Sequence, residues 1–214
     1  MTVDRIMSKN TICTNPGVSV ADARSIMQRE GIGRLPVLDK NNNLVGIVTE
    51  LDIINASPSS ASTLDIYEMG QLLSKLKVEK VMEKNVLTVT ESTMVEEAAR
   101  IMADNHISGL PVMRNGKVVG IVTERDLFRF FIDIFGARSL GTRVTFYLRE
   151  QPGELAKISK IIADNGGNII TFVTCPGSDV ANKLRMVKIA GIKPEKIREI
   201  LALPDLDIVD VVQC

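Results

Sequence analysis

The sequence predicts an α+β fold in which two βαββα repeats pack as a pair and a ferredoxin-like βαββαβ unit follows. Three observations support this prediction. The same pattern occurs twice in the first two thirds of the chain, at an offset of 75 residues that falls to 74 after a shortened loop. Within each copy, apolar residues recur at helical spacing beside two short strand-like runs. The remainder of the chain has a single strand–helix–strand–strand–helix–strand order.

The duplication can be followed along the chain. A leading segment, a Leu-Pro-Val strand and a Gly-Ile-Val-Thr-Glu-x-Asp motif each occur twice in the same order. They occupy 3–10 and 78–85, 35–37 and 110–112, and 46–52 and 120–126. Each copy alone is too short to bury a comfortable core, so we expect the two to pack together.

Each copy is predicted to contain a leading extended segment, a helix, two strands and a second helix. The helices over 20–30 and 95–105 place their apolar residues on one face. The strand pair of the first copy turns through 39–43, whereas that of the second turns tightly on Asn115-Gly116. The second helix of each copy then begins at the threonine of the repeated motif.

The connecting segments set the predicted domain boundaries. Residues 57–62 are rich in Ser and Pro and predict a loop, and 64–76 predicts a helix that packs on the pair or on a second copy. The phenylalanine-rich run 128–135 predicts core or subunit-interface packing. The expected bounds are 1–54 for the first repeat, 55–77 for the linker and helix, 78–135 for the second repeat, 136–141 for a linker and 142–214 for the C-terminal domain.

The C-terminal domain predicts a split β-α-β unit, with an antiparallel sheet and its helices on one face. Gly166-Gly167 ends the first helix of this domain. The predicted elements are strands at 143–149, 168–175, 184–189 and 208–212, helices at 154–165 and 194–203, and a turn at 176–179.

The composition narrows the classes of function. Lys+Arg and Asp+Glu are equal at 26 each, so the net charge of zero gives no support to a nucleic-acid partner. No run approaches the roughly 20 apolar residues of a membrane helix, and the polar N-terminus lacks a signal-peptide core. We therefore expect a cytoplasmic protein with no membrane partner. Cys13, Cys175 and Cys214 are odd in number and far apart, which favours free thiols over a zinc site or disulfides.

The sequence offers little for catalysis. It has one histidine, His106, and lacks a phosphate-binding loop, a nucleophile elbow and a histidine-rich metal cluster. We therefore predict no catalytic residues, no metal ligands and no enzymatic activity.

The repeated motif is the sharpest chemical signal. Thr49 and Asp52, like Thr123 and Asp126, have the spacing of a capping box at the start of a helix. The same groups suit a nucleotide, because free N–H groups at a helix start bind phosphate and a carboxylate accepts both hydroxyls of a ribose. The glycines that open the motifs, Gly46 and Gly120, would let a ligand approach the backbone. The spacing of these residues alone does not distinguish the capping-box interpretation from the nucleotide-site interpretation.

These residues resemble a tandem pair of CBS domains over about residues 1–135. The resemblance implies a pair packed about a pseudo-twofold axis that binds AMP, ADP, ATP, or sometimes S-adenosylmethionine or NAD, in one or two clefts. Mg²⁺ is a candidate companion if the ligand is ATP. The resemblance also implies that Asp52 and Asp126 hold ribose, and that Thr49 and Thr123 contact ribose or phosphate. The other implied contacts, chiefly to adenine, are Ile12, Cys13, Thr14, Ile32, Arg34, Leu35, Pro36, Leu87, Thr88, Val89, His106, Ile107, Leu110, Pro111 and Arg125.

The two copies differ at positions that bear on the ligand. Arg125 replaces Leu51, and His106 replaces Gly31. Arg125 and Arg34 are either phosphate partners or solvated surface charges, and His106 is either structural or a ligand contact. We therefore expect the two clefts to differ in affinity, or only one of them to bind.

Residues 142–214 resemble an ACT domain, a small regulatory fold of amino-acid metabolism. The resemblance lies in the run from Glu150 to Leu155, in Ile158 and in 165–169. It implies an amino-acid site at the turn and helix start, usually across a dimer interface. A simple strand-to-helix turn explains Pro152-Gly153 equally well. The implied contacts are Glu150, Pro152, Gly153, Glu154, Leu155, Asn168 and Ile169.

Two CBS repeats followed by an ACT domain resemble bacterial regulators of the acetoin-utilisation protein B type. We expect a homodimer, because both module types commonly pair and a small split β-α-β sheet exposes an edge that pairing would cover. The expected function is a sensor that binds a nucleotide and signals to an unidentified protein partner through the geometry of the dimer. The alternative is a structural dimerisation module whose clefts no longer bind a ligand. Assembly would then rest on the run 128–135 and on the edge of the C-terminal sheet.

Overall fold

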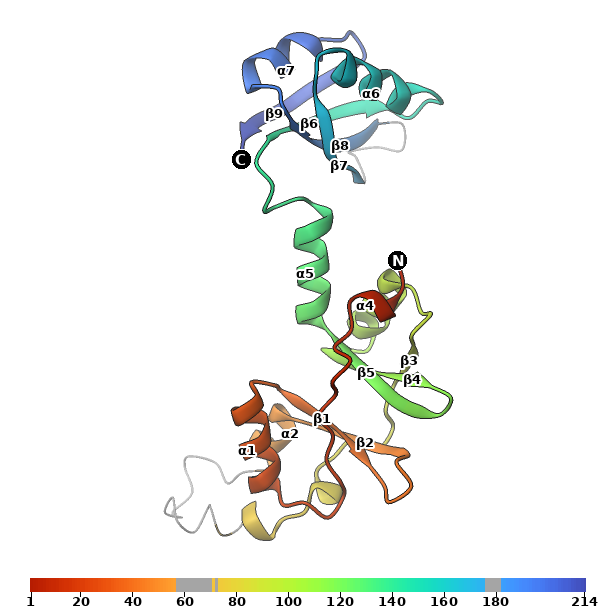
Figure 1. Ribbon diagram of the computed structural model, residues 1–214, viewed down its shortest axis with the longest axis vertical. Helices are drawn as coiled ribbons and strands as arrows, with labels where there is room; N and C mark the ends of the chain where they lie inside the picture. Colours follow the sequence, from red (N-terminus) through yellow and green to blue (C-terminus); the bar gives the residue numbers. More distant parts are fainter. Residues whose placement is uncertain (57–70, 72, 176–181) are drawn as a thin grey trace. The chain divides into compact units, whose positions relative to one another are not determined.

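The computed structural model describes residues 1–56, 71, 73–175 and 182–214 (Figure 1). The chain forms two compact units, Met1–Leu127 and Phe128–Cys214. This division falls inside a helix, whereas the sequence placed it in a linker at 136–141. The predicted loop at 57–62, most of the predicted helix at 64–76 and the predicted turn at 176–179 lie outside the described residues.

The first unit contains both repeats, and each shows a helix, an antiparallel strand pair and a second helix. The first repeat consists of η1 (Val3–Arg5), α1 (Val20–Glu30), β1 (Arg34–Leu38), β2 (Leu44–Thr49) and α2 (Glu50–Asn55). The second consists of η2 (Val78–Lys80), β3 (Val89–Thr90), α4 (Val95–Asp104), β4 (Gly109–Arg114), β5 (Lys117–Thr123) and α5 (Glu124–Ile134). Asn115 and Gly116 turn with φ angles of 50° and 75°, as the tight turn predicted between β4 and β5 requires.

The two repeats exchange their leading segments. Ser8 pairs with Ile121 of the second repeat, and Glu83 pairs with Ile47 of the first. Val3 is fully buried in the hydrophobic core of the second repeat as a result. The sequence repeat does not reveal this exchange, because each segment precedes its own copy along the chain.

Each repeat therefore has a core made partly by the other repeat's leading segment or by the connecting segment. Leu73, within the short helical stretch 73–75, packs into the first core, as expected for the end of the predicted helix. The first core contains Val20, Ala23, Met27, Leu35, Val37, Val48, Ile53, Leu73 and Val78. The second contains Val3, Met7, Val89, Ala98, Met102, Leu110, Val112 and Val122.

The two repeats begin their first helices differently. Ser19 caps α1 by accepting a hydrogen bond from the Asp22 N–H at 3.0 Å. Met94 occupies the same place before α4 and provides no side-chain cap. Its side chain is 50% exposed, so it contributes little to the core.

We expect Met94→Ser to raise the free energy of unfolding by about 1 kcal/mol, because a serine at this position can accept a backbone N–H of the first turn. Urea denaturation would measure the change. Met94→Ala is the matched control, because it removes the same side chain without supplying an acceptor. Equal stability of the serine and alanine variants would contradict the prediction.

The phenylalanines of 128–135 do not form a core in this chain. Phe128 is 66% exposed and Phe131 is 55% exposed. Phe131 stacks on Phe135 with ring centroids 4.2 Å apart. Phe128 and Phe131 therefore do not pack into a core of this chain, and the subunit-interface alternative stays a prediction.

The second unit carries a four-stranded antiparallel sheet in the order β7-β8-β6-β9, with α6 and α7 on one face (Figure 1). The elements are β6 (Thr142–Arg149), α6 (Glu154–Asp164), β7 (Asn168–Cys175), β8 (Asn182–Ala190), α7 (Pro194–Ile200) and β9 (Leu206–Gln213). Their βαββαβ order is the one that the sequence predicted. Phe146, Leu148, Ile158, Ile162, Val187, Ile189 and Ile197 form the centre of its core.

Three further findings apply to the described residues. Cys13, Cys175 and Cys214 are free thiols. No described helix is long and apolar enough to cross a membrane. Within the same ranges, no group of three or more His, Cys, Asp or Glu side chains is placed to hold a metal ion.

Candidate functional site

A cavity of about 690 Å³ lies between the two repeats of the first unit. Its volume falls within the range of about 300–1,000 Å³ that is typical of small-molecule sites. The first repeat contributes the start of β1 and the junction of β2 with α2. The second repeat contributes the segments that precede β3 and β4.

Thr49 and Asp52 form a complete capping box at the wall of this cavity. The N–H and the hydroxyl of Thr49 donate to Asp52 Oδ2 at 2.8 and 2.7 Å, and the Asp52 N–H donates to Thr49 Oγ1 at 3.3 Å. Asp52 Oδ1 has no hydrogen-bond partner among the described residues. The capping and ribose-binding interpretations are therefore compatible, because one oxygen holds the helix start and the other remains available.

Most of the N–H groups that the sequence led us to expect as free at the start of α2 are already bonded. The Glu50 N–H donates to the carbonyl of Gly33 at 2.9 Å. The Asp52 N–H is occupied by Thr49, and the Thr49 N–H by Asp52. Three backbone donors that would otherwise suit a phosphate are thus already used within the protein.

The motif glycines, Gly46 and Gly120, lie against the exchanged leading segments and not at a surface that a ligand could approach. A Cβ at Gly46 would lie 2.5 Å from Met82 Sδ and 3.0 Å from the carbonyl oxygen of Glu83. Met7 is placed in the same way against Gly120, 2.6 Å from its would-be Cβ. These glycines make room for the exchanged leading segments, so the expectation that they expose backbone to a ligand was wrong.

Arg34 is the one Lys or Arg among the described residues that line the cavity. Its Nη1 donates to the carbonyl of Ser108, and its Nη2 donates to Ser108 Oγ at 2.5 Å. Burial lowers the pKa of Arg34, while the nearby carboxylates of Glu124 and Asp126 act in the opposite direction. Arg34 is therefore tied to the second repeat and is not a freely solvated charge.

The second copy of the motif repeats the capping geometry at the start of α5. The N–H and the hydroxyl of Thr123 donate to Asp126 Oδ2 at 2.9 and 2.7 Å. Asp126 is buried, and Arg125 beside it is exposed. None of these three residues lines the cavity.

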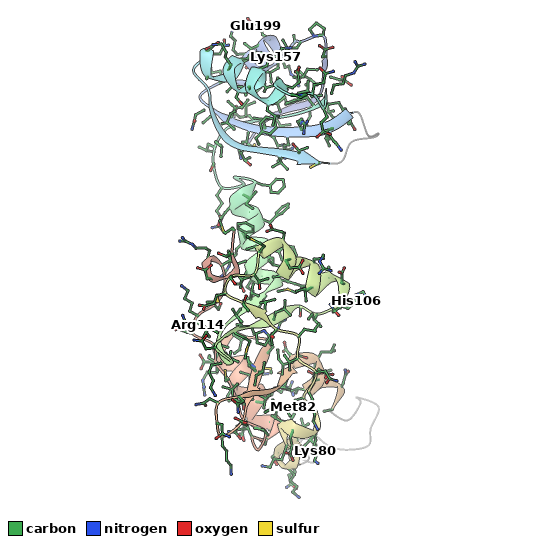
Figure 2. All side chains as sticks on the ribbon, turned by 90° about the vertical axis from the view of Figure 1, so that its right-hand side faces the viewer. Lys80, Met82, His106, Arg114, Lys157 and Glu199 are labelled. Carbon is green, nitrogen blue, oxygen red and sulfur yellow. The ribbon has the colours of Figure 1, made fainter. Side chains whose placement is uncertain are left out.

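The cavity brings together six predicted ligand contacts from both repeats: Arg34, Thr49, Asp52, Leu87, His106 and Ile107. His106, labelled in Figure 2, lies at the surface of the second repeat with a φ of 54°. Leu35 and Leu110 are instead fully buried core residues. The other predicted contacts that do not line this cavity are Ile12, Cys13, Thr14, Ile32, Pro36, Thr88, Val89, Pro111, Thr123, Arg125 and Asp126.

Several lining residues were not predicted from the sequence. They include Gly33, Ile47, Glu50, Leu51, Glu83 and Asn85. Glu50 and Leu51 lie within the repeated motif, so adjacency to Asp52 could have indicated them. Glu83 reaches the cavity through its backbone pairing with Ile47, a long-range contact for which the sequence carries no signal.

The predicted amino-acid contacts of the second unit fall into two groups. Glu150, Pro152, Gly153, Glu154 and Leu155 lie between the end of β6 and the start of α6, where Gly153 has a φ of 91°. Asn168 and Ile169 begin β7, and Ile169 pairs with Ile189 of β8. Ile189 pairs in turn with Thr142 at the start of β6, the end of that strand opposite to Glu150. One chain therefore does not bring the two groups together.

Comparison with known proteins shows that the chain belongs to the CBS domain family. The family model matches residues 3–59 and 78–133, which together cover more than half of the chain. An uncharacterized 17.7 kDa protein of Acidianus ambivalens is 39% identical over 133 residues, covering 62% of this chain and 74% of the relative. The chain spans only 32% and 23% of the length of two longer relatives from Methanocaldococcus jannaschii.

Solved structures of CBS proteins with bound ligands resemble the same part of the chain. The CBS domain pair of protein MJ0100, in complex with 5′-methylthioadenosine and S-adenosylmethionine, is 32% identical with a TM-score of 0.52, over 65% of this chain and 98% of that one. CBSX2 in complex with AMP is 31% identical with a TM-score of 0.53, over 62% of this chain and 97% of that one. The ligands bound to both proteins are adenosine compounds.

A protein of Vibrio cholerae described as a candidate acetoin utilization protein also matches. It is 25% identical with a TM-score of 0.53, over 64% of this chain and 95% of that one. The resemblance to this type of regulator is thus supported for the CBS pair, and the assignment of the second unit to the ACT family stays a prediction.

Proposed function

We propose that this chain is a regulatory sensor that binds an adenosine-containing ligand in the cavity between its CBS repeats and catalyses no reaction of its own. The candidate ligands are AMP, ADP, ATP and S-adenosylmethionine, and Mg²⁺ would enter only as a companion of ATP. The observation that carries the proposal is the free Oδ1 of Asp52, directed by a capping box at the wall of a cavity of nucleoside size. The ligands of MJ0100 and CBSX2 support the same class of compound.

The proposal assigns each side of the cavity a part of the ligand. Asp52 and Thr49 would bind the ribose, because a carboxylate accepts hydrogen bonds from both sugar hydroxyls. The apolar side chains of Leu87 and Ile107 lie on the opposing repeat and would cover the adenine. Leu87 is 43% exposed, so a stacked base would remove apolar surface from water.

Asp52→Asn should weaken the binding of the best adenosine ligand by about 10- to 100-fold, because hydrogen bonds to a charged group contribute about 1.5–3 kcal/mol. Titration calorimetry would measure the affinity. Asp22→Asn is the matched control, because Asp22 is also the first-turn acid of a helix cap but does not line the cavity. Equal affinities of the two variants would refute the assignment of Asp52, and a protein that binds no adenosine compound would refute the proposed function.

We also propose that the signal passes through a homodimer to a protein partner. Phe128 and Phe131 are large apolar side chains left exposed on α5, which favours a subunit contact there. The second unit would act as an ACT domain. Its two groups of predicted amino-acid contacts could form one site only if a second copy supplies one of them.

The alternative is a structural dimerisation module whose clefts are vacant in the cell. This alternative also uses the exposed residues of α5 for assembly, but it predicts that the cavity binds no ligand. Release of small molecules from the purified protein by denaturation, followed by mass spectrometry, separates the two, because only the sensor retains or takes up an adenosine compound.

A further inference from the structure

The charges around the cavity restrict the kind of ligand that it can take. Glu50, Asp52 and Glu83 line it, and Arg34 is the one guanidinium or ammonium group that the described lining residues supply. Counted over its Asp, Glu, Lys and Arg side chains, the lining therefore has an excess of two negative charges. A phosphate monoester carries about −1.5 to −2 at neutral pH and would be repelled by this lining.

Arg34 does not correct this excess. Its guanidinium is already hydrogen-bonded to the carbonyl and hydroxyl of Ser108. It also lies in the field of two carboxylates of the second repeat, Glu124 and Asp126. These contacts hold the guanidinium against the second repeat and offset part of its charge, so Arg34 is a weaker partner for a phosphate than a free arginine.

The backbone at the start of α2 offers little compensation. Phosphates commonly bind to free N–H groups at a helix start. At the start of α2, however, the N–H groups of Thr49, Glu50 and Asp52 are bonded to Asp52, Gly33 and Thr49 respectively. The charge of the side chains and the occupation of these backbone donors therefore both disfavour a phosphate in the cavity.

From these three observations we infer that the cavity selects adenosine derivatives whose 5′ substituent carries no phosphate and is neutral or cationic. This inference rests on the proposed function and names the ligand class of the same cavity. The ribose contacts to Asp52 are common to every candidate ligand. Discrimination arises at the 5′ substituent, where Glu50 and Glu83 would attract a cation such as a sulfonium and repel a phosphate.

The test compares four probes by titration calorimetry: adenosine, 5′-methylthioadenosine, S-adenosylmethionine and AMP. The Arg125→Gln protein is titrated beside the unmodified one, because Arg125 near the second motif could hold a phosphate outside this cavity. We expect 5′-methylthioadenosine and S-adenosylmethionine to bind about tenfold or more tightly than AMP. Added salt should weaken S-adenosylmethionine binding and strengthen AMP binding, because it screens both interactions.

Glu83→Gln examines the electrostatic cause directly. It should raise the affinity for AMP about two- to fivefold, lower that for S-adenosylmethionine by a similar factor and leave that for 5′-methylthioadenosine unchanged. Glu79→Gln is the matched control, because Glu79 is an exposed carboxylate of the same segment that does not line the cavity.

The outcomes separate the inference from the proposed function. If none of the four probes binds, the proposed function fails. If AMP binds more tightly than 5′-methylthioadenosine, the function stands and the inference is overturned. If the order of affinities is the expected one but Glu83→Gln behaves like Glu79→Gln, charge is not the cause and the inference is equally overturned.

Discussion

Phe146→Ala should destabilise the second unit by about 3–5 kcal/mol and leave the first unit folded. Phe146 is fully buried at the centre of the β6–β9 core, so its truncation removes apolar contacts and leaves a cavity. The described core residues of this unit all lie within 144–211, whereas those of the two repeats lie within 3–122. Because the cores share no residue, the loss should stay within one unit.

Urea denaturation followed by amide hydrogen exchange would measure this result, since exchange reports the protection of each unit separately. We expect the protection of 142–213 to fall and that of the repeats to stay as in the unmodified protein. Leu140→Ala is the matched control, because Leu140 is 86% exposed and its truncation should cost little. A parallel loss of protection in both units would show that they do not fold independently.

The repeated architecture was predictable because its signals are local. Helical spacing, the turn at Asn115-Gly116 and the caps at Thr49 and Thr123 each depend on residues within a few positions of one another. Such short-range preferences agree with the final structure wherever the chain makes no conflicting long-range contact. The order of strands and helices in the second unit was predictable for the same reason.

The residues that line the cavity were harder to predict from the sequence, because they are brought together by pairing between segments far apart in the chain. The sequence predicted Asp52 and Leu87 as ligand contacts, but it did not indicate that Asp52 of the first repeat and Leu87 of the second line the same cavity. The pairing of Ile47 with Glu83 brings them to one cavity and adds a carboxylate to it. The same exchange explains why Gly46 accommodates Met82 and not a ligand.

The exchanged leading segment leads to a second strong effect: Val3→Asp should destabilise the first unit by about 4 kcal/mol or more at pH 7. Val3 is 0% exposed and packs with the core residues of the second repeat. An aspartate there must either carry a buried charge or stay protonated. Its ordinary pKa is about 3.9, so protonation at pH 7 costs about 4 kcal/mol at roughly 1.4 kcal/mol per pH unit.

The pH dependence of the stability of this variant distinguishes the cost of a buried charge from the cost of lost apolar packing. Burial would raise the folded-state pKa of the new carboxyl above its unfolded value, so the variant is penalised least below about pH 4. The penalty should grow by roughly 1.4 kcal/mol per unit as the pH rises towards 7, until the folded-state carboxyl itself ionises. Val209→Asp is the control, because Val209 is 55% exposed and its replacement should show neither the large loss nor this slope. If the two variants behave alike in urea denaturation at pH 4 and pH 7, the leading segment does not enter the core of the second repeat, and the crossed arrangement that builds the cavity is wrong.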